Sequence, residues 1–173
     1  DEKIKIGWNK LMGKEIDLLK NYPKPKRDLN KRLIEKTDED RTIARKFGKE
    51  FFDGNRSQGY GGYNYNPRFW SPVVPTFKDY WKLNSNHDLL DVGCGKGFMI
   101  FDIKRLIPGI NVKGIDISEY AIKNCIQDMR NNVSVANAIN LPFKDNSFDV
   151  VISINTIHNL EIDECAIALK EIE

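Results

Sequence analysis

Short apolar runs alternate with amphipathic stretches along the second half of the chain. The runs lie at residues 89–92, 112–117, 133–138 and 148–155, and each is short and rich in β-branched or other aliphatic side chains. Continuous short runs of this kind are typical of strands buried in a parallel sheet. Strands that alternate with helices predict an α/β fold with a doubly wound, mostly parallel sheet over residues 84–173.

Three stretches between and after these runs repeat apolar residues at helical spacing. The first covers residues 97–107 and stops at Pro108, the second is capped by Ser118, and the third covers residues 163–172. The positions predicted to face inward are Met99, Ile103, Leu106 and Ile107 in the first, Ile122, Cys125, Ile126 and Met129 in the second, and Cys165, Ala168, Leu169 and Ile172 in the third.

Residues 1–83 carry helical patterns and predict a helical extension that precedes the sheet. Residues 1–20 form an amphipathic stretch, and the two prolines of residues 21–28 predict a linker after it. A capping-box sequence at Thr37 predicts a helix to Phe52, and a further helix is expected over residues 72–83. The predicted inward positions are Ile43, Ala44, Phe47 and Phe51 in one helix and Val73, Phe77, Tyr80 and Trp81 in the other.

The segment 53–70, DGNRSQGYGGYNYNPRFW, follows neither a helical nor a strand period. One interpretation is a surface loop whose aromatic side chains tuck inward. The interpretation we favour is a mobile flap over a ligand site, with glycine hinges and with Tyr60 and Tyr63 as aromatic walls. Arg56 and Arg68 are weaker candidates for contact with an anionic group.

Composition narrows the class of protein. The chain has 173 residues, 40% of them hydrophobic, and no apolar run near eighteen residues. This composition predicts a soluble cytoplasmic domain without a membrane partner. Three scattered cysteines do not have metal-ligand spacing, so no metal site is expected. Residues 1–56 carry a net charge of +5 and residues 57–173 one of −3, but acids and bases are interleaved, which favours solvated helix faces over a nucleic-acid surface.

The stretch LLDVGCGKGF, residues 89–98, turns from strand to helix across Gly93, Gly95 and Gly97. Residues without a Cβ allow a tight turn and close approach of a ligand to N–H groups at a helix start. Asp91 at the edge of this turn suits a cationic group. The spacing differs from the dinucleotide fingerprint G-x-G-x-x-G. It resembles motif I of the class I S-adenosylmethionine-dependent methyltransferases, and Lys96 within it is expected to face solvent.

Downstream features extend this resemblance over residues 86–172. VKGIDI, residues 112–117, carries Asp116 at the end of a predicted strand, nineteen residues after Gly97, and Asn137 precedes LPFKDNSFDVV. The resemblance implies that S-adenosyl-L-methionine is the cofactor, with its ribose on Asp116, its adenine face on Ile117 and its adenine edge at Asn137 and Ala138. The methionyl part would contact Asp91, Gly93, Cys94 and Gly95. Cys94 otherwise has the character of a small space-filling residue.

The fourth apolar run ends in Asn155-Thr156-Ile157-His158-Asn159, which the resemblance places at the methyl acceptor. This stretch lacks the N-P-P-Y pattern of amino-methylating DNA enzymes and the Pro-Cys nucleophile of cytosine C5 enzymes, which argues against both classes. It resembles instead the N-x-x-H element of the type-11, UbiE-like small-molecule group. Asn155 is then a cofactor contact. His158 is the candidate general base, or else only a backbone hydrogen-bond partner.

The implied activity is methyl transfer to an O, N or C atom of a small-molecule acceptor. The alternatives are a non-catalytic S-adenosylmethionine-binding or scaffold protein and a nicotinamide-dependent dehydrogenase, which the glycine spacing disfavours. A homo-oligomer is left open. The family has seven strands in the order 3-2-1-4-5-7-6, so we expect strand order 3-2-1-4 here and a chain that lacks the carboxy-terminal strands.

Overall fold

The computed structural model describes residues 15–24 and 36–173. Most of the helix expected over residues 1–20 therefore lies outside the described residues. Within residues 15–20 the chain enters a turn rather than a helix. Among the described residues, no helix has the length and apolar character needed to cross a membrane.

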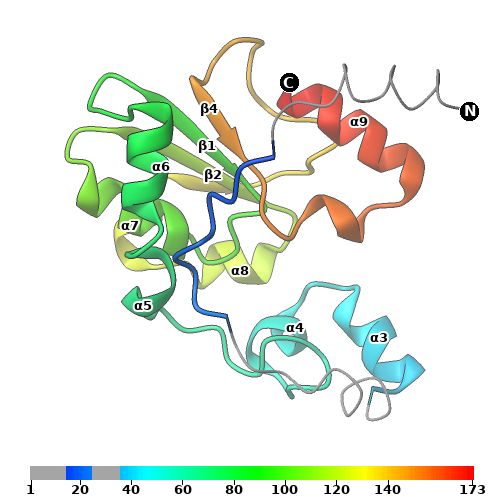
Figure 1. Cartoon of the computed structure of the whole chain (residues 1–173). Coiled ribbons are helices and arrows are strands. Elements are labelled where there is room, and N and C mark those ends of the chain that lie inside the picture. Colours follow the sequence, from blue (N-terminus) through cyan, green and yellow to red (C-terminus); the bar gives the residue numbers. More distant parts are fainter. Residues whose placement is uncertain (1–14, 25–35) are drawn as a thin grey trace, which may run out of the picture.

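Four parallel strands form one sheet: β1 (Asp88–Val92), β2 (Asn111–Asp116), β3 (Val133–Val135) and β4 (Val150–Ile152). Their order is β3-β2-β1-β4, which confirms the predicted order (Figure 1). In register, Leu89 of β1 lies between Val112 of β2 and Val150 of β4. The last two strands are shorter than the predicted runs, because the residues that flank them leave the sheet to shape the edge of a pocket.

Helices cover both faces of this sheet. The helices α6 (Val74–Trp81) and α7 (Phe98–Leu106) lie on one face and α9 (Ile162–Ile172) on the other (Figure 1). Side chains of β1 alternate accordingly: Leu89 belongs to the core cluster with Phe77 and Ile103, whereas Leu90 belongs to the cluster with Ala168. Because successive side chains of a strand point to opposite faces of the sheet, neighbouring residues of β1 belong to two separate hydrophobic cores.

Two of the predicted helices differ in their details. Ser118 caps α8 (Glu119–Lys123) as predicted, but the helix stops early and a short 3₁₀ helix, η1 (Gln127–Met129), follows. The reason is that the Ile126 N–H donates to the Lys96 carbonyl of the glycine turn at 3.0 Å instead of continuing the helix. In α9 Ala168 is buried as expected, whereas Leu169 is 56% exposed, so its inward placement was wrong.

The helix predicted from Thr37 to Phe52 is two helices. The capping box is confirmed, because the Asp40 N–H donates to Thr37 Oγ1 at 3.1 Å and the Thr37 N–H to Asp40 Oδ2 at 3.2 Å. The first helix, α3 (Asp38–Ala44), ends before Phe47, whose φ of 48° interrupts the helix. A second helix, α4 (Lys49–Asp53), buries Phe52 rather than the predicted Phe51.

A short helix, α5 (Pro67–Trp70), lies in the segment that was expected to have no helical period. Its start has the usual chemistry, since Asn66 Oδ1 accepts from the Arg68 N–H at 3.1 Å and Pro67 occupies the first turn. The next helix, α6, begins at Val74 rather than residue 72, and Tyr80 on it is 49% exposed instead of inward.

Candidate functional site

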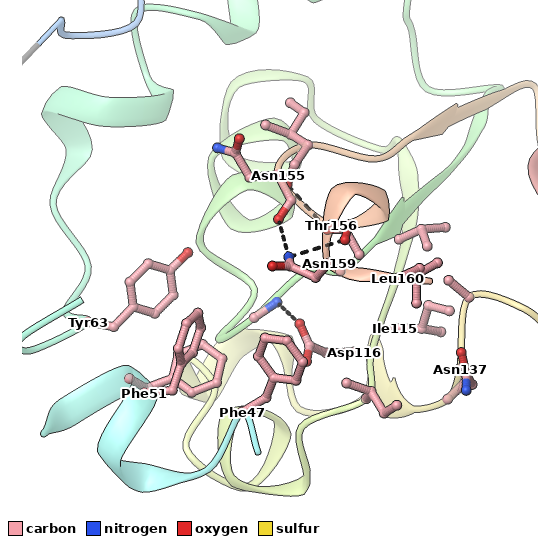
Figure 2. A pocket seen from close by; sticks show the side chains of 18 of the residues that line it. Phe47, Phe51, Tyr63, Ile115, Asp116, Asn137, Asn155, Thr156, Asn159 and Leu160 are labelled. Atoms are coloured by element: carbon pink, nitrogen blue, oxygen red, sulfur yellow. Dashed lines mark hydrogen bonds between the residues drawn. The ribbon is translucent and has the colours of Figure 1, made fainter. Parts of the chain in front are cut away.

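A pocket opens at the carboxyl ends of β1, β2 and β4, and the segment that carries Phe47 and Phe51 lies beneath it in the view of Figure 2. Its free space, including the part that is open to solvent, is about 790 Å³. Open α/β sheets bind ligands in this crevice. The residues that line it are Phe47, Phe51, Phe52, Tyr60, Tyr63, Val92, Gly93, Gly95, Ile115, Asp116, Ile117, Ala136, Asn137, Ala138, Ile154, Asn155, Thr156, Asn159 and Leu160.

The glycine turn forms the floor of the pocket. Gly93, Gly95 and Gly97 have φ of 90°, 55° and 77°, a region that residues with a Cβ rarely adopt. The N–H groups of Gly93 and Cys94 donate to the Ile115 carbonyl at 2.8 and 2.9 Å. A Cβ at Gly93 would lie 1.8 Å from Thr156 Oγ1. Packing within the protein therefore requires this glycine, whatever ligand lies above it.

Asp116 reaches across from the end of β2 to hold the turn. Its Oδ2 accepts from the Gly95 N–H at 2.7 Å and its Oδ1 from the Ser118 N–H at 2.9 Å. Burial raises the pKa of Asp116, although these two hydrogen bonds oppose that shift. A carboxylate has about four acceptor positions, so each oxygen of Asp116 can still accept one hydroxyl donor. This arrangement suits a diol such as a ribose.

Asp91 lies beneath the turn and is only 3% exposed, so it is not part of the pocket lining. Burial, and after it the nearby Asp116 charge, raise the pKa of Asp91 to about 8. No described residue donates a hydrogen bond to its carboxylate. A buried carboxylate without a donor is a group that a cationic ligand group would stabilise.

Cys94 packs away from the pocket. Its Cβ and Sγ lie 2.8 Å from the position that a Cβ would take on Gly114, so Gly114 makes room for the thiol within the core. Burial raises the pKa of Cys94 well above its usual value. Its side chain is therefore a protonated packing group, and only its backbone remains for the ligand contact predicted for it.

Aromatic rings form the wall opposite the glycine turn. Tyr60 and Tyr63, both predicted, line the pocket with ring centroids 4.3 Å apart, and Phe51 meets Tyr60 at 5.2 Å (Figure 2). Phe47 and Phe52 complete the wall. Phe47 and Phe51 were predicted only as part of a packed helix face, and Phe52 only as the end of that helix, so all three were missed as site residues. Tyr60 and Tyr63 of segment 53–70 line the pocket, although Tyr60 is 39% exposed, and the role of this segment as a mobile flap over a ligand stays a prediction.

Lys96 contradicts the expectation that it faces solvent. Only 6% of the residue is exposed, and Nζ lies 2.7 Å from Asp53 Oδ2 at the end of α4. The signal for this contact was absent from the sequence, because Asp53 and Lys96 are 43 residues apart.

The pocket rim beyond β2 carries the side chains predicted for an adenine. Ile117 is 53% exposed although it is aliphatic, and it lines the pocket together with Asn137 and Ala138. Asn137 Oδ1 accepts from the Ile139 N–H at 3.2 Å, which orients the amide. An exposed aliphatic side chain beside a fixed amide suits a flat heterocycle with a polar edge.

The end of β4 supplies the remaining rim. Asn155 has φ of 56° and lines the pocket, and Asn159 Nδ2 donates to the Asn155 and Thr156 carbonyls at 3.2 Å each (Figure 2). Asn159 belongs to the stretch that was expected at the acceptor, but it was not singled out as a site residue. His158 lies in the 3₁₀ helix η2 (Ile157–Asn159), is exposed and is not among the lining residues.

The second half of this chain matches a methyltransferase family model. The sequence model of a family described as a methyltransferase domain matches residues 90–173. A tRNA (carboxymethyluridine(34)-5-O)-methyltransferase of Arabidopsis thaliana is 37% identical over 92 residues, which are 53% of this chain and 21% of that protein. Norajmaline N-methyltransferase of Rauvolfia serpentina is 34% identical over 84 residues, 44% of this chain and 28% of that protein.

Among solved structures, the PH0226 protein from Pyrococcus horikoshii OT3 is similar with a TM-score of 0.54 and 28% identity. The similarity covers 72% of this chain and 56% of that one. The chain thus spans only 21% and 28% of the two curated relatives reported above and 56% of this neighbour.

Proposed function

Since residues 90–173 belong to the class I, type-11 methyltransferase domain family, we propose that the chain transfers a methyl group from S-adenosyl-L-methionine to an O, N or C atom of a small-molecule acceptor. The observation that carries the proposal is the pair of carboxylates around the glycine turn. Asp91, buried without a donor, and Asp116, bonded to the turn at Gly95, belong to adjacent strands at one edge of the sheet.

The residues present fit this cofactor. Asp116 has acceptor positions left for two ribose hydroxyls, and Ile117, Asn137 and Ala138 offer an apolar face and a polar edge to adenine. The N–H groups of residues 93–95 are already bonded to Ile115 and Asp116, so their carbonyls would accept from the methionyl ammonium, which would pair with Asp91 after that carboxyl releases its proton. Tyr60 and Tyr63 would face the sulfonium, where aromatic rings stabilise a cation by roughly 0.5–2 kcal/mol.

The bound cofactor supplies an electrophilic methyl on a good leaving group. The task of the protein is then to align an acceptor atom with that methyl, and such orientation can contribute about 7–11 kcal/mol to lowering a barrier. Asn155 and Asn159 lie at the rim that faces the acceptor, and their amides can orient a hydroxyl or an amine. His158, exposed at the same rim, remains our candidate base for an acceptor that must lose a proton.

The pocket supports a small acceptor with apolar surface. Five aromatic residues line it, and Asp116 is the one ionisable acid or base on its lining among the described residues, tyrosine hydroxyls aside. The relatives act, by their names, on carboxymethyluridine 34 of a tRNA and on norajmaline. The acceptor atom differs between them, so we leave it as O, N or C.

Titration calorimetry with S-adenosylhomocysteine tests the proposal. We expect wild-type protein to bind and Ile117→Asp to lose at least about tenfold in affinity, because a charge would replace the apolar face under adenine. Ile117 is 53% exposed, so the variant should fold. Ile162→Asp, at a position 85% exposed on α9, is the matched control and should bind normally.

No heat with wild-type protein would refute the assignment. Binding without methyl release from labelled cofactor, over a panel of phenols, amines and carboxylic acids, would instead favour a non-catalytic binding protein. His158→Gln, compared with wild type over pH on any acceptor found, tests the proposed base.

A further inference from the structure

Lys96 stands inside the glycine turn, and its ammonium is held by the segment that carries Tyr63. Nζ donates to Asp53 Oδ2 at 2.7 Å, to Asp53 Oδ1 at 2.9 Å and to the Tyr63 carbonyl at 2.9 Å. The Lys96 side chain is only 7% exposed. An ammonium has three donors, and this one has three acceptors around it.

Asp53 at the end of α4 ties three elements together. Besides Lys96, its Oδ1 accepts from the Tyr63 N–H at 3.0 Å and its Oδ2 from the Tyr120 hydroxyl of α8 at 2.7 Å. Partial burial alone would raise the pKa of Asp53, but the hydrogen bonds from Lys96, Tyr120 and the Tyr63 N–H lower it to about 2. The carboxylate therefore stays ionised at any physiological pH.

These bonds hold the backbone of Tyr63 at both of its polar groups. The N–H is fixed by Asp53 and the carbonyl by Lys96, while Lys96 and Asp53 are bonded to each other. The ring of Tyr63 then lies 3.2 Å from the position that a Cβ would take on Gly95. Its centroid is 4.3 Å from that of Tyr60 and 4.9 Å from that of Phe98.

We propose that Lys96 and Asp53 are positioning residues, which hold the Tyr63 ring beside Gly95 so that the ring faces the charged sulfur of the cofactor. This role rests on the proposed function, because it needs S-adenosylmethionine in the pocket. A ring that is already fixed loses little entropy when the ligand binds, whereas a loose ring must be ordered first. Lys96 of the glycine turn thus affects cofactor binding indirectly, because it fixes the position of the Tyr63 ring.

The two forms of the cofactor separate this role from a merely structural one. S-adenosylmethionine carries a cationic sulfonium and S-adenosylhomocysteine a neutral thioether, so only the first gains from an aromatic face at the sulfur. Misplacing the Tyr63 ring should weaken binding of the cation more than binding of the neutral ligand. General loosening of the pocket would weaken both alike.

The experiment measures both dissociation constants by calorimetry for wild type, Lys96→Met and Lys104→Met. We expect Lys96→Met to lose about five- to tenfold in affinity for S-adenosylmethionine and less than about threefold for S-adenosylhomocysteine. Lys104→Met is the matched control, because Lys104 is exposed on α7 and does not line the pocket, and it should leave both constants unchanged. Tyr120→Phe, which removes only the hydroxyl bond to Asp53, should shift the ratio in the same direction by less.

A double-mutant cycle completes the test. In a Tyr63→Leu background, where the ring is gone but the backbone bonds can remain, Lys96→Met should no longer change the ratio of the two constants. Equal losses for both ligands, or an undiminished effect in that background, would overturn the positioning role while leaving the proposed function intact. Wild-type protein that binds neither ligand would overturn both. Should Lys96→Met fail to fold, the Tyr120→Phe ratio decides.

Discussion

Asp91 shows how strongly one side chain depends on its surroundings. In the printed sequence it is one of many carboxylates, whereas in the fold it is buried beside Asp116 with a pKa of about 8. The protein therefore holds a proton there near neutral pH that the unfolded chain, with a carboxyl pKa of 3.8, releases. Because the folded state binds more protons at Asp91, the contribution of this group to the free energy of unfolding falls as pH rises from about 4 towards 8.

Replacing Asp91 by asparagine should remove this dependence. We expect the wild type to lose stability relative to Asp91→Asn between about pH 4 and pH 8, by up to about 1.4 kcal/mol per pH unit. Urea denaturation of both proteins over this range measures the difference, in which all other titrating groups cancel. The same variant should bind S-adenosylhomocysteine more weakly, since the ligand ammonium loses its partner. A pH-independent difference would contradict the assigned burial of the charge.

At the scale of the element, Ser118 both caps α8 and bonds to the turn between α3 and α4. Its Oγ accepts from the Ala121 N–H at 3.0 Å and so begins α8, and its hydroxyl donates to the Phe47 carbonyl between α3 and α4. The side chain is 4% exposed. Thr37, in contrast, caps only α3 and does so near solvent. The same cap chemistry was recognisable at both positions, but the bond to Phe47 was not.

Alanine at the two caps should therefore have unequal effects. Thr37→Ala should cost about 1 kcal/mol, the usual value of a lost cap. Ser118→Ala should cost about 2–3 kcal/mol, because it also leaves the Phe47 carbonyl without its partner. Chemical denaturation gives both values, and hydrogen exchange should show faster opening of α4 in the Ser118 variant. Equal costs would mean that the contact with Phe47 contributes nothing.

The pocket joins two parts of the molecule that are distant in the sequence. Residues 47–63 supply the aromatic wall and residues 92–160 the floor and the rim. A ligand between them binds only the folded, assembled state, so it must stabilise the whole chain by mass action.

Saturating S-adenosylhomocysteine should consequently raise the midpoint of thermal unfolding. At one hundred times its dissociation constant the expected stabilisation is about 2.7 kcal/mol. Differential scanning calorimetry measures the shift, and hydrogen exchange should slow in α4 as well as in the glycine turn. Protection confined to the sheet would indicate that the aromatic wall does not contact the ligand.

Much of the architecture was predictable because it depends on local pattern. The four strands, the capping box at Thr37 and the cap at Ser118 follow from apolar period and hydrogen-bonding side chains, whereas the order of the strands was implied by the family resemblance. Element ends were predicted less well, because long-range bonds decide them. The bond from Ile126 to the Lys96 carbonyl, at the point where the predicted second helix fails to continue, is one such case.

The sequence by itself determined the glycine turn, the carboxylates of adjacent strands and hence the family, since these depend on spacing along one stretch of chain. Tertiary structure alone decided that Lys96 is buried on Asp53, that Phe47 and Phe52 line the pocket and that His158 is exposed outside the lining. The physical reason is that burial, charge pairing and side-chain direction depend on which distant segments meet. Local periodicity carries no information about those contacts.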